Sequence, residues 1–235
     1  MPRDAIPFER TSSVTDINKI FLIAAEGFKT EFFYLSALNE RHGRICRLVP
    51  FKRPPEEASH SAPNRVLSQL KREAAKLNLK DDDSCWLVVD RDSWGQVLID
   101  AVNECKRLKY NSIVSAPCFE IWLLFYFTKL QELSEDQKNQ IISNTYVTKR
   151  ETFIEKLLTN FMAELRLGKY KANKELPEFF FDPNNIQKAI DEARFIEQEE
   201  ILNNDKYEFP IEVGSQVYQM LSLFFHENSI QIENP

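Results

Sequence analysis

Short apolar segments alternate with amphipathic ones through roughly the first half of the chain. Four apolar runs have the length of buried strands, at residues 19–25, 45–49, 85–89 and 111–116. Three segments between them repeat apolar positions at helical spacing, at residues 30–41, 66–77 and 95–109. Strands that are apolar on both faces and alternate with helices predict an α/β fold, with a parallel sheet covered by helices on both faces.

The pattern changes in the second half. Residues 118–127 are nearly all apolar, so we expect a helix buried between the sheet and a second layer. From Ser134 onward the strand signal fades, and helical patterns follow near residues 149–167, 183–203 and 214–226. We therefore predict an α/β core at residues 17–130 and a helical C-terminal subdomain at residues 131–235 that packs on the core.

The composition limits which chemistry the chain can carry. Its 235 residues are 43% hydrophobic, and no apolar run is long enough to cross a bilayer, so we expect a globular cytoplasmic protein without membrane contact. Four scattered cysteines and three histidines disfavour a disulfide framework, a zinc cluster or a histidine-based triad. Carboxylates must then carry any catalysis. A net charge of −6 disfavours a strong sequence-blind nucleic-acid binder but leaves room for a local basic groove.

Three carboxylates follow predicted strands. Glu26 comes directly after the first strand, while Asp90 and Asp92 end the third. Ligands of a parallel sheet bind at the carboxyl ends of its strands, and carboxylate oxygens are what Mg²⁺ prefers. A single strand-end carboxylate is more often a turn or capping residue. Three of them on the appropriate strands favour a metal site suited to phosphate chemistry.

The residues after Glu26 resemble a phosphate-binding loop only superficially. Lys29 and Thr30 match its last two positions, but the glycines that the loop requires are missing, so we expect no hydrolysis of nucleoside triphosphates by the chain alone. Lys29 is either a contact for a substrate phosphate or a solvated lysine of the first helical turn. Gly27 allows a close backbone approach or a positive φ, and Glu31 can serve as a partner of the helix dipole.

Glu120 lies in the first turn expected for the helix after Pro117. Its carboxylate could serve the same metal site. A carboxylate in a first turn also stabilises the helix dipole without any functional role, and the position of Glu120 by itself favours this reading.

Four short motifs, in their order and spacing, resemble the RloB-like family, which is related to the AbiLii-type abortive-infection proteins. They are EGFKTE at 26–31, VVDRD at 88–92, SAPCFEIW at 115–122 and GKYK at 168–171. The resemblance implies a TOPRIM-like (Rossmann-like) fold in which Glu26, Asp90 and Asp92 bind Mg²⁺ or Mn²⁺. It also aligns the family's lysine with Lys29.

Two further parts of the resemblance concern supporting residues. The PCFE element of the family falls on Pro117 to Glu120. Its lysine-rich element is matched by Tyr170 and Lys171, although Ala172 stands where a second lysine is often found.

The resemblance implies a role in antiphage defence beside an operon-encoded ATPase partner. Our leading hypothesis is a metal-dependent nuclease acting on RNA, tRNA included, or on DNA, with Glu26, Asp90, Asp92 and Lys29 as catalytic residues. The alternative is a non-catalytic interaction module that regulates a partner ATPase or sensor. A third possibility is a small-molecule phosphohydrolase, which would use the same kind of metal site. A homo-oligomer is compatible with each reading. A group of basic residues favours a polymeric phosphate substrate: Arg41, Arg44, Arg47, Lys52, Arg53 and Arg65.

Overall fold

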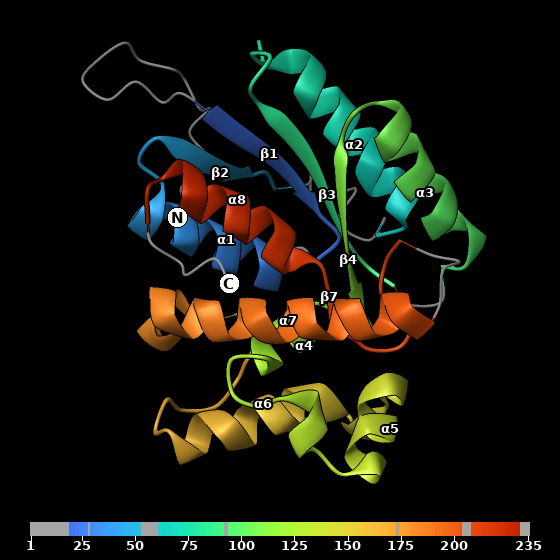
Figure 1. Cartoon of the computed structure of the whole chain (residues 1–235), viewed down its shortest axis with the longest axis vertical. Helices are drawn as coiled ribbons and strands as arrows, with labels where there is room; N and C mark the ends of the chain where they lie inside the picture. The colour runs from blue at the N-terminus through green and yellow to red at the C-terminus, as the bar shows by residue number, and fades with distance from the viewer. Residues whose placement is uncertain are drawn as a thin grey trace.

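Five strands form one mostly parallel sheet in the computed structural model, with the spatial order β2-β1-β3-β4-β7 (Figure 1). The structure describes residues 19–27, 29–52, 61–91, 94–172, 174–203 and 208–230, without the side chains of 200–203. The strands are β1 Lys19–Ala25, β2 Cys46–Pro50, β3 Ser84–Asp90, β4 Asn111–Ala116 and β7 Gly214–Ser215. The first four are parallel, and β7 pairs antiparallel with β4.

Helices cover both faces of this sheet. The helices are α1 Thr30–His42, α2 Pro63–Lys76, α3 Gln96–Arg107, α4 Glu120–Leu124, α5 Glu135–Ser143, α6 Phe153–Glu164, α7 Pro183–Asn203 and α8 Val217–Glu227. Along β1, Leu22 and Ala24 pack in the core under α2 and α3, whereas Phe21 and Ile23 pack in the core that includes α1 and α8. This alternation confirms the predicted sheet with helices on both faces.

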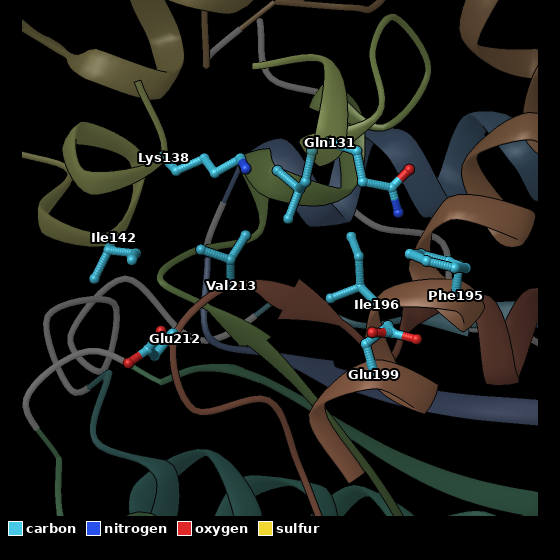
Figure 2. A pocket seen from close by; sticks show the side chains of 9 residues that line it. Gln131, Lys138, Ile142, Phe195, Ile196, Glu199, Glu212 and Val213 are labelled. Atoms are coloured by element: carbon cyan, nitrogen blue, oxygen red, sulfur yellow. The ribbon is translucent and has the colours of Figure 1, made fainter. Parts of the chain in front are cut away.

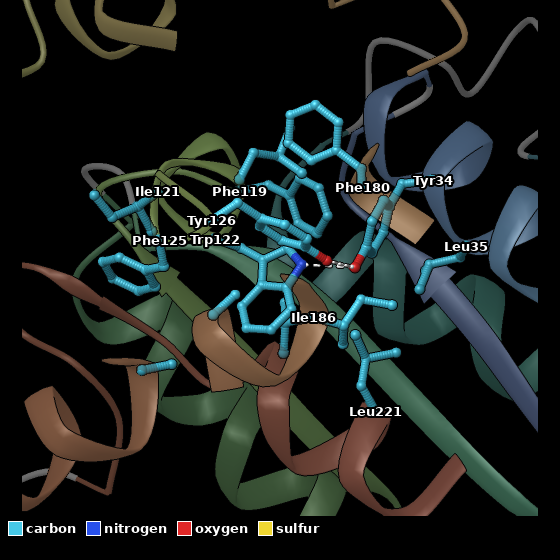
Figure 3. Packing of buried hydrophobic residues seen from close by; sticks show 14 of the residues in the cluster. Tyr34, Leu35, Phe119, Ile121, Trp122, Phe125, Tyr126, Phe180, Ile186 and Leu221 are labelled. Carbon is cyan, nitrogen blue, oxygen red and sulfur yellow. Dashed lines mark hydrogen bonds between the residues drawn. The ribbon is translucent and has the colours of Figure 1, made fainter. Parts of the chain in front are cut away.

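Two cores of different size result from this arrangement. The core on the α1 side continues through α4, α6 and α7, so the helices of the second half extend it beyond the sheet (Figure 1). At its centre Trp122 Nε1 donates to Tyr34 Oη at 2.9 Å, and the hydroxyls of Tyr34 and Tyr126 are 2.7 Å apart (Figure 3). The buried polar atoms of three aromatic residues thereby satisfy one another.

Several elements differ from the sequence prediction. The predicted apolar helix at 118–127 is regular only from Glu120 to Leu124 and ends in turns, although Trp122 and Phe125 are buried as expected. A hairpin of β5 Tyr146–Thr148 and β6 Glu151–Thr152 precedes α6, where a continuous helix was predicted. Helix α5 was not predicted, because Ile141 is its only buried residue and gives no apolar periodicity.

The C-terminal part of the chain contributes to the sheet layer as well as to the helical layer. Strand β7 pairs with β4, and α8 contacts β2 and β4. The short 3₁₀ helix η2 Leu130–Glu132 lies between α4 and α5, and η3 Glu178–Phe181 lies between α6 and α7. The predicted boundary between the α/β core and the helical subdomain at residue 130 stays a prediction.

Among the described helices, none combines the length and apolar character that crossing a membrane requires.

Candidate functional site

The strand order reverses between β1 and β3, and two predicted site residues lie at this point. From β1 the chain passes through α1 to β2 on one side, and then through α2 to β3 on the other side of β1. The carboxyl ends of the two strands at such a reversal diverge and leave a crevice for ligands. Glu26 follows β1 and Asp90 ends β3, so both lie at the crevice.

Glu26 is held in place by the neighbouring strand. Its backbone N–H donates to Val88 O at 2.8 Å, which continues the ladder between β1 and β3 by one residue. Its Oε2 accepts from the backbone N–H of Asp90 at 2.9 Å, and its Oε1 accepts from Trp94 Nε1 at 3.3 Å. The side chain is 7% exposed. The Glu26 carboxylate therefore contacts the Asp90 backbone, Asp92 lies outside the described residues, and convergence of the three carboxylates stays a prediction.

Gly27 leaves room for a second buried glutamate. The carboxylate of Glu31, which is 4% exposed, accepts from the backbone N–H of Gly27 at 2.8 Å. A Cβ at position 27 would lie 1.8 Å from Glu31 Oε2, so a side chain there would displace the Glu31 carboxylate. Of the two roles predicted for Gly27, the structure thus supports the close approach, and the positive-φ glycines of the described chain are Gly95 and Gly168.

Glu31 lies close to other carboxylates. Its pKa is raised to about 7, chiefly because burial disfavours the charged form and then because Glu120 and Glu26 carry negative charges nearby. Glu31 is therefore more than a partner of the helix dipole. It is part of an acidic cluster, which we define as Glu26, Glu31, Asp90 and Glu120.

Glu120 joins the cluster from α4. The half-buried thiol of Cys118 lies near both Glu120 and Asp90. Its pKa is held well above its usual range, chiefly by the exclusion of water and then by the negative charges of these two residues. Both carboxylates therefore lie within electrostatic range of the same thiol. Among the described residues no group of three or more histidine, cysteine, aspartate or glutamate side chains is arranged to hold a metal ion, so the metal role of the cluster stays a prediction.

The predicted lysine-rich element crosses the same edge. Tyr170 is buried, and its hydroxyl donates to Glu120 Oε1 at 2.8 Å. Burial, followed by the charge of Glu120, holds the pKa of Tyr170 well above its usual range. The hydroxyl of Thr30, at the start of α1, donates to the carbonyl of Ala172 at 2.8 Å. The segment around Tyr170 is therefore tied both to α4 and to α1.

Lys29 and Lys171 flank these contacts. Both side chains are exposed, and neither forms an ion pair with a described residue. Lys29 directly precedes α1, and its carbonyl accepts from the backbone N–H of Phe33 at 2.9 Å. Two cationic side chains are thus available to an anion that approaches the acidic cluster.

The basic residues that favoured a polymeric substrate are not gathered at this edge. Arg41 lies in the last turn of α1 and pairs with Glu178, while Arg44 and Arg47 lie at the amino end of β2, which is the opposite edge of the sheet. Only Lys52 and Arg65 follow the carboxyl end of β2, and Arg53 lies outside the described residues. The group does not form one surface, so it gives less support to such a substrate than the sequence indicated.

A pocket of about 460 Å³ is lined by residues outside the acidic cluster (Figure 2). It opens between α5, η2, α7 and the segment before β7, and no predicted site residue lines it. Ile142, Phe195, Ile196 and Val213 form apolar parts of its wall, and Lys138 lies at its α5 side.

The sequence analysis did not predict that Trp94 contacts Glu26. It assigned Glu31 only a role at the helix dipole and not a place in the acidic cluster. The only available signal for Trp94 was an aromatic residue shortly after the third strand, which is common in a core. The signal for Glu31 was its spacing from Gly27, which places it one turn into the helix that follows the strand.

Comparisons with known proteins identify the family of the chain. Neither the curated proteins nor the solved structures gave a significant match. The sequence model of the RloB-like proteins, in contrast, matches residues 21–223, which extend from β1 into α8 and include the whole acidic cluster. The chain therefore belongs to the RloB-like protein family.

Proposed function

We propose that this protein is a metal-dependent nuclease that hydrolyses phosphodiester bonds of RNA or DNA with the help of Mg²⁺ or Mn²⁺. The observation that carries the proposal is the hydrogen bond from the Asp90 backbone to Glu26 at the reversal of strand order. It brings two carboxylate-bearing strand ends together where α/β sheets bind ligands. Asp92, two residues beyond Asp90, would complete the set.

The residues present fit a hard divalent cation. Mg²⁺ takes oxygen ligands, and Glu26 and Asp90 supply carboxylates at neighbouring strand ends. The raised pKa of Glu31 reflects the cost of gathering negative charges in a buried place. A cation bound by Glu26, Asp90 and Asp92 would offset that cost.

The side chains around the cation have separate tasks in this proposal. A bound divalent cation lowers the pKa of a water and polarises the phosphate. Glu26 either completes the coordination or accepts the proton of the attacking water, and Trp94 fixes its orientation. Lys29, exposed at the start of α1, would neutralise a phosphate oxygen near the helix N-terminus.

The biological setting that we propose is antiphage defence. It rests on membership in the RloB-like family and on the resemblance of its motifs to abortive-infection proteins. Because the chain lacks a complete phosphate-binding loop, the ATP dependence of such a system would come from an ATPase partner.

A cleavage assay tests the proposed activity. Plasmid, single-stranded DNA and a tRNA pool are incubated with the protein and Mg²⁺ or Mn²⁺, and wild type is compared with Asp90→Ala. The matched control is Asp82→Ala, which removes an exposed carboxylate before β3, at the opposite edge of the sheet. We expect cleavage by wild type and by the control, and none by Asp90→Ala.

Thermal melting covers the case in which cleavage requires a partner. A cation that binds only the folded state stabilises it by about 2.7 kcal/mol at 100 times its dissociation constant. Wild type and Asp82→Ala should therefore melt later when Mg²⁺ or Mn²⁺ is added, whereas Asp90→Ala should respond weakly. A wild type that neither cleaves nor gains stability from either metal would refute the nuclease proposal.

A second candidate function is a non-catalytic interaction module. The pocket beside α5 favours it, because Ile142 and Phe195 are 38% and 42% exposed there and could receive an apolar side chain of a partner protein (Figure 2). Substitution of Phe195 by aspartate should abolish binding to an ATPase partner under this alternative. Under the nuclease proposal it should leave metal-dependent cleavage unchanged.

A further inference from the structure

The β5–β6 hairpin presents an aromatic side chain to solvent. Tyr146 is 74% exposed, which makes it the most exposed large hydrophobic residue of the described chain, and Val147 beside it is 40% exposed. A tyrosine ring in water loses the packing that normally stabilises an aromatic residue. Its position on a short hairpin rather than in a core indicates a surface that stacks on something outside the chain.

The turn of the same hairpin is positively charged. Lys149 and Arg150 connect β5 to β6, and both side chains are exposed. Neither forms an ion pair with a described residue. Two unpaired cations next to an exposed aromatic ring complement a polyanion that carries flat rings.

The base of the hairpin adjoins the acidic cluster. Asn144 precedes β5, and its Nδ2 donates to Cys118 Sγ at 3.4 Å, while its Oδ1 accepts from the backbone N–H of Ile154 at 3.1 Å. Cys118 lies two residues before Glu120. Glu155, in the first turn of α6, also lies within electrostatic range of Glu120. Its pKa is raised chiefly by burial and further by the negative charge of Glu120. Contacts of the residues just before and just after the hairpin thus anchor it beside the site.

We propose that the β5–β6 hairpin binds an unpaired segment of nucleic acid beside the acidic cluster, an inference that rests on the proposed nuclease function. Tyr146 stacks on a base, and Lys149 and Arg150 contact backbone phosphates. The hairpin therefore favours single-stranded over double-stranded nucleic acid, because a base inside a duplex offers no free face to the ring.

Binding is measured by fluorescence anisotropy in EDTA, so that cleavage plays no part. The probes are a fluorescein-labelled single-stranded RNA, a single-stranded DNA of the same sequence, and the corresponding duplexes. Full-length wild type is compared with Tyr146→Ala, Tyr146→Phe and the double variant Lys149→Ala/Arg150→Ala. The control is Lys76→Ala/Lys80→Ala, which removes two positive charges near the amino end of β3, at the opposite edge of the sheet.

Each variant has its own expected result. Tyr146→Ala should weaken binding of the single strands by about tenfold, whereas Tyr146→Phe keeps the ring and should bind like wild type. The double variant at the turn should flatten the dependence of log affinity on log salt by about 1.4, which corresponds to two lost phosphate contacts. The control should change neither quantity. Comparison of the RNA and DNA probes then identifies which of the two is preferred.

Two outcomes would overturn the inference. One is a wild type that binds neither single strand, or binds duplex more tightly. The other is single-strand binding that is unchanged in both Tyr146→Ala and the double variant at the turn, which would assign Tyr146 to a protein partner. Binding by the hairpin without metal-dependent cleavage or stabilisation would instead refute the nuclease proposal and leave only the binding of single strands by the hairpin.

Discussion

The backbone N–H of Gly27 donates to Glu31 Oε1 at 2.8 Å, so a glutamate of the first turn of α1 folds back onto the end of β1. The contact requires position 27 to lack a side chain, since a Cβ there would lie within 2.2 Å of three carboxyl atoms of Glu31. It places a buried carboxylate beside Glu26 and Glu120. The close approach thus links the turn after β1 to the acidic cluster.

The Gly27→Ala variant should displace the Glu31 carboxylate. The loss of a buried hydrogen bond is expected to lower the free energy of unfolding by about 1–3 kcal/mol, and cleavage should fall with it. Urea unfolding and the cleavage assay measure the two effects. Unchanged stability and activity in Gly27→Ala would contradict the geometry.

Glu31 makes the stability depend on pH. Its pKa of about 7 in the folded protein lies above the ordinary carboxyl value of 4.5, so the folded state binds the proton more tightly than the unfolded chain. The contribution is fully present below pH 4.5 and is lost as the pH rises through 7. Relative to Glu31→Gln, wild type should therefore lose up to about 3 kcal/mol of stability across this range.

Urea unfolding in EDTA at about pH 5 and about pH 8 measures this difference. An exposed carboxylate of α6 provides the control variant, Glu164→Gln, which should follow wild type at both pH values. A constant gap between wild type and Glu31→Gln would mean that Glu31 titrates like a solvated carboxylate.

Trp94 should tune the affinity for metal through Glu26. The Trp94→Phe variant keeps a ring but removes the N–H that donates to Glu26 Oε1, so the carboxylate loses a hydrogen bond that orients it. We expect the affinity for Mg²⁺ to fall by about tenfold, as measured by titration of the melting temperature. In the control Trp86→Phe the lost N–H donates to Ser84 Oγ at the start of β3, so metal affinity should persist although stability falls.

Tyr170 and Glu120 should be energetically coupled. The hydroxyl of Tyr170 is a donor to a half-buried carboxylate at 2.8 Å, and hydrogen bonds to charged groups stabilise by about 1.5–3 kcal/mol. A double-mutant cycle of Tyr170→Phe and Glu120→Gln, followed by urea unfolding, measures this coupling. Additive effects of the two substitutions would show that the contact contributes nothing.

Asn228 should be a major contributor to stability. Its Oδ1 accepts from the backbone N–H groups of Arg44, Ile45 and Cys46, and its Nδ2 donates to the carbonyls of Cys46 and Phe224. The residue is 6% exposed, so Asn228→Ala leaves buried polar groups without partners and should lower the free energy of unfolding by about 3 kcal/mol or more.

The control for this effect is an asparagine with a single contact to a backbone carbonyl. Asn185 Nδ2 donates to Phe179 O at 3.1 Å, and Asn185→Ala should cost only about 1 kcal/mol. Equal losses in Asn228→Ala and Asn185→Ala would show that the three contacts at the start of β2 are weak.

The periodicity of the first 116 residues was sufficient to predict the parallel sheet and the position of Glu26 and Asp90 at one edge of it. Strand direction and strand ends follow from local patterns, because βα units place all carboxyl ends of a parallel sheet on the same side. The same local patterns predicted that Glu120 begins a helix and that Lys29 precedes one. These features depend on neighbours in the sequence.

Contacts between distant residues were decided only by the tertiary structure. Trp94 reaches Glu26 across 68 positions, and Tyr170 reaches Glu120 across 50. The antiparallel strand β7 exists because two residues near the C-terminus pair with the end of β4. No local pattern encodes such pairings, since their free energy comes from burial and hydrogen bonds that form only when the distant segments are packed together.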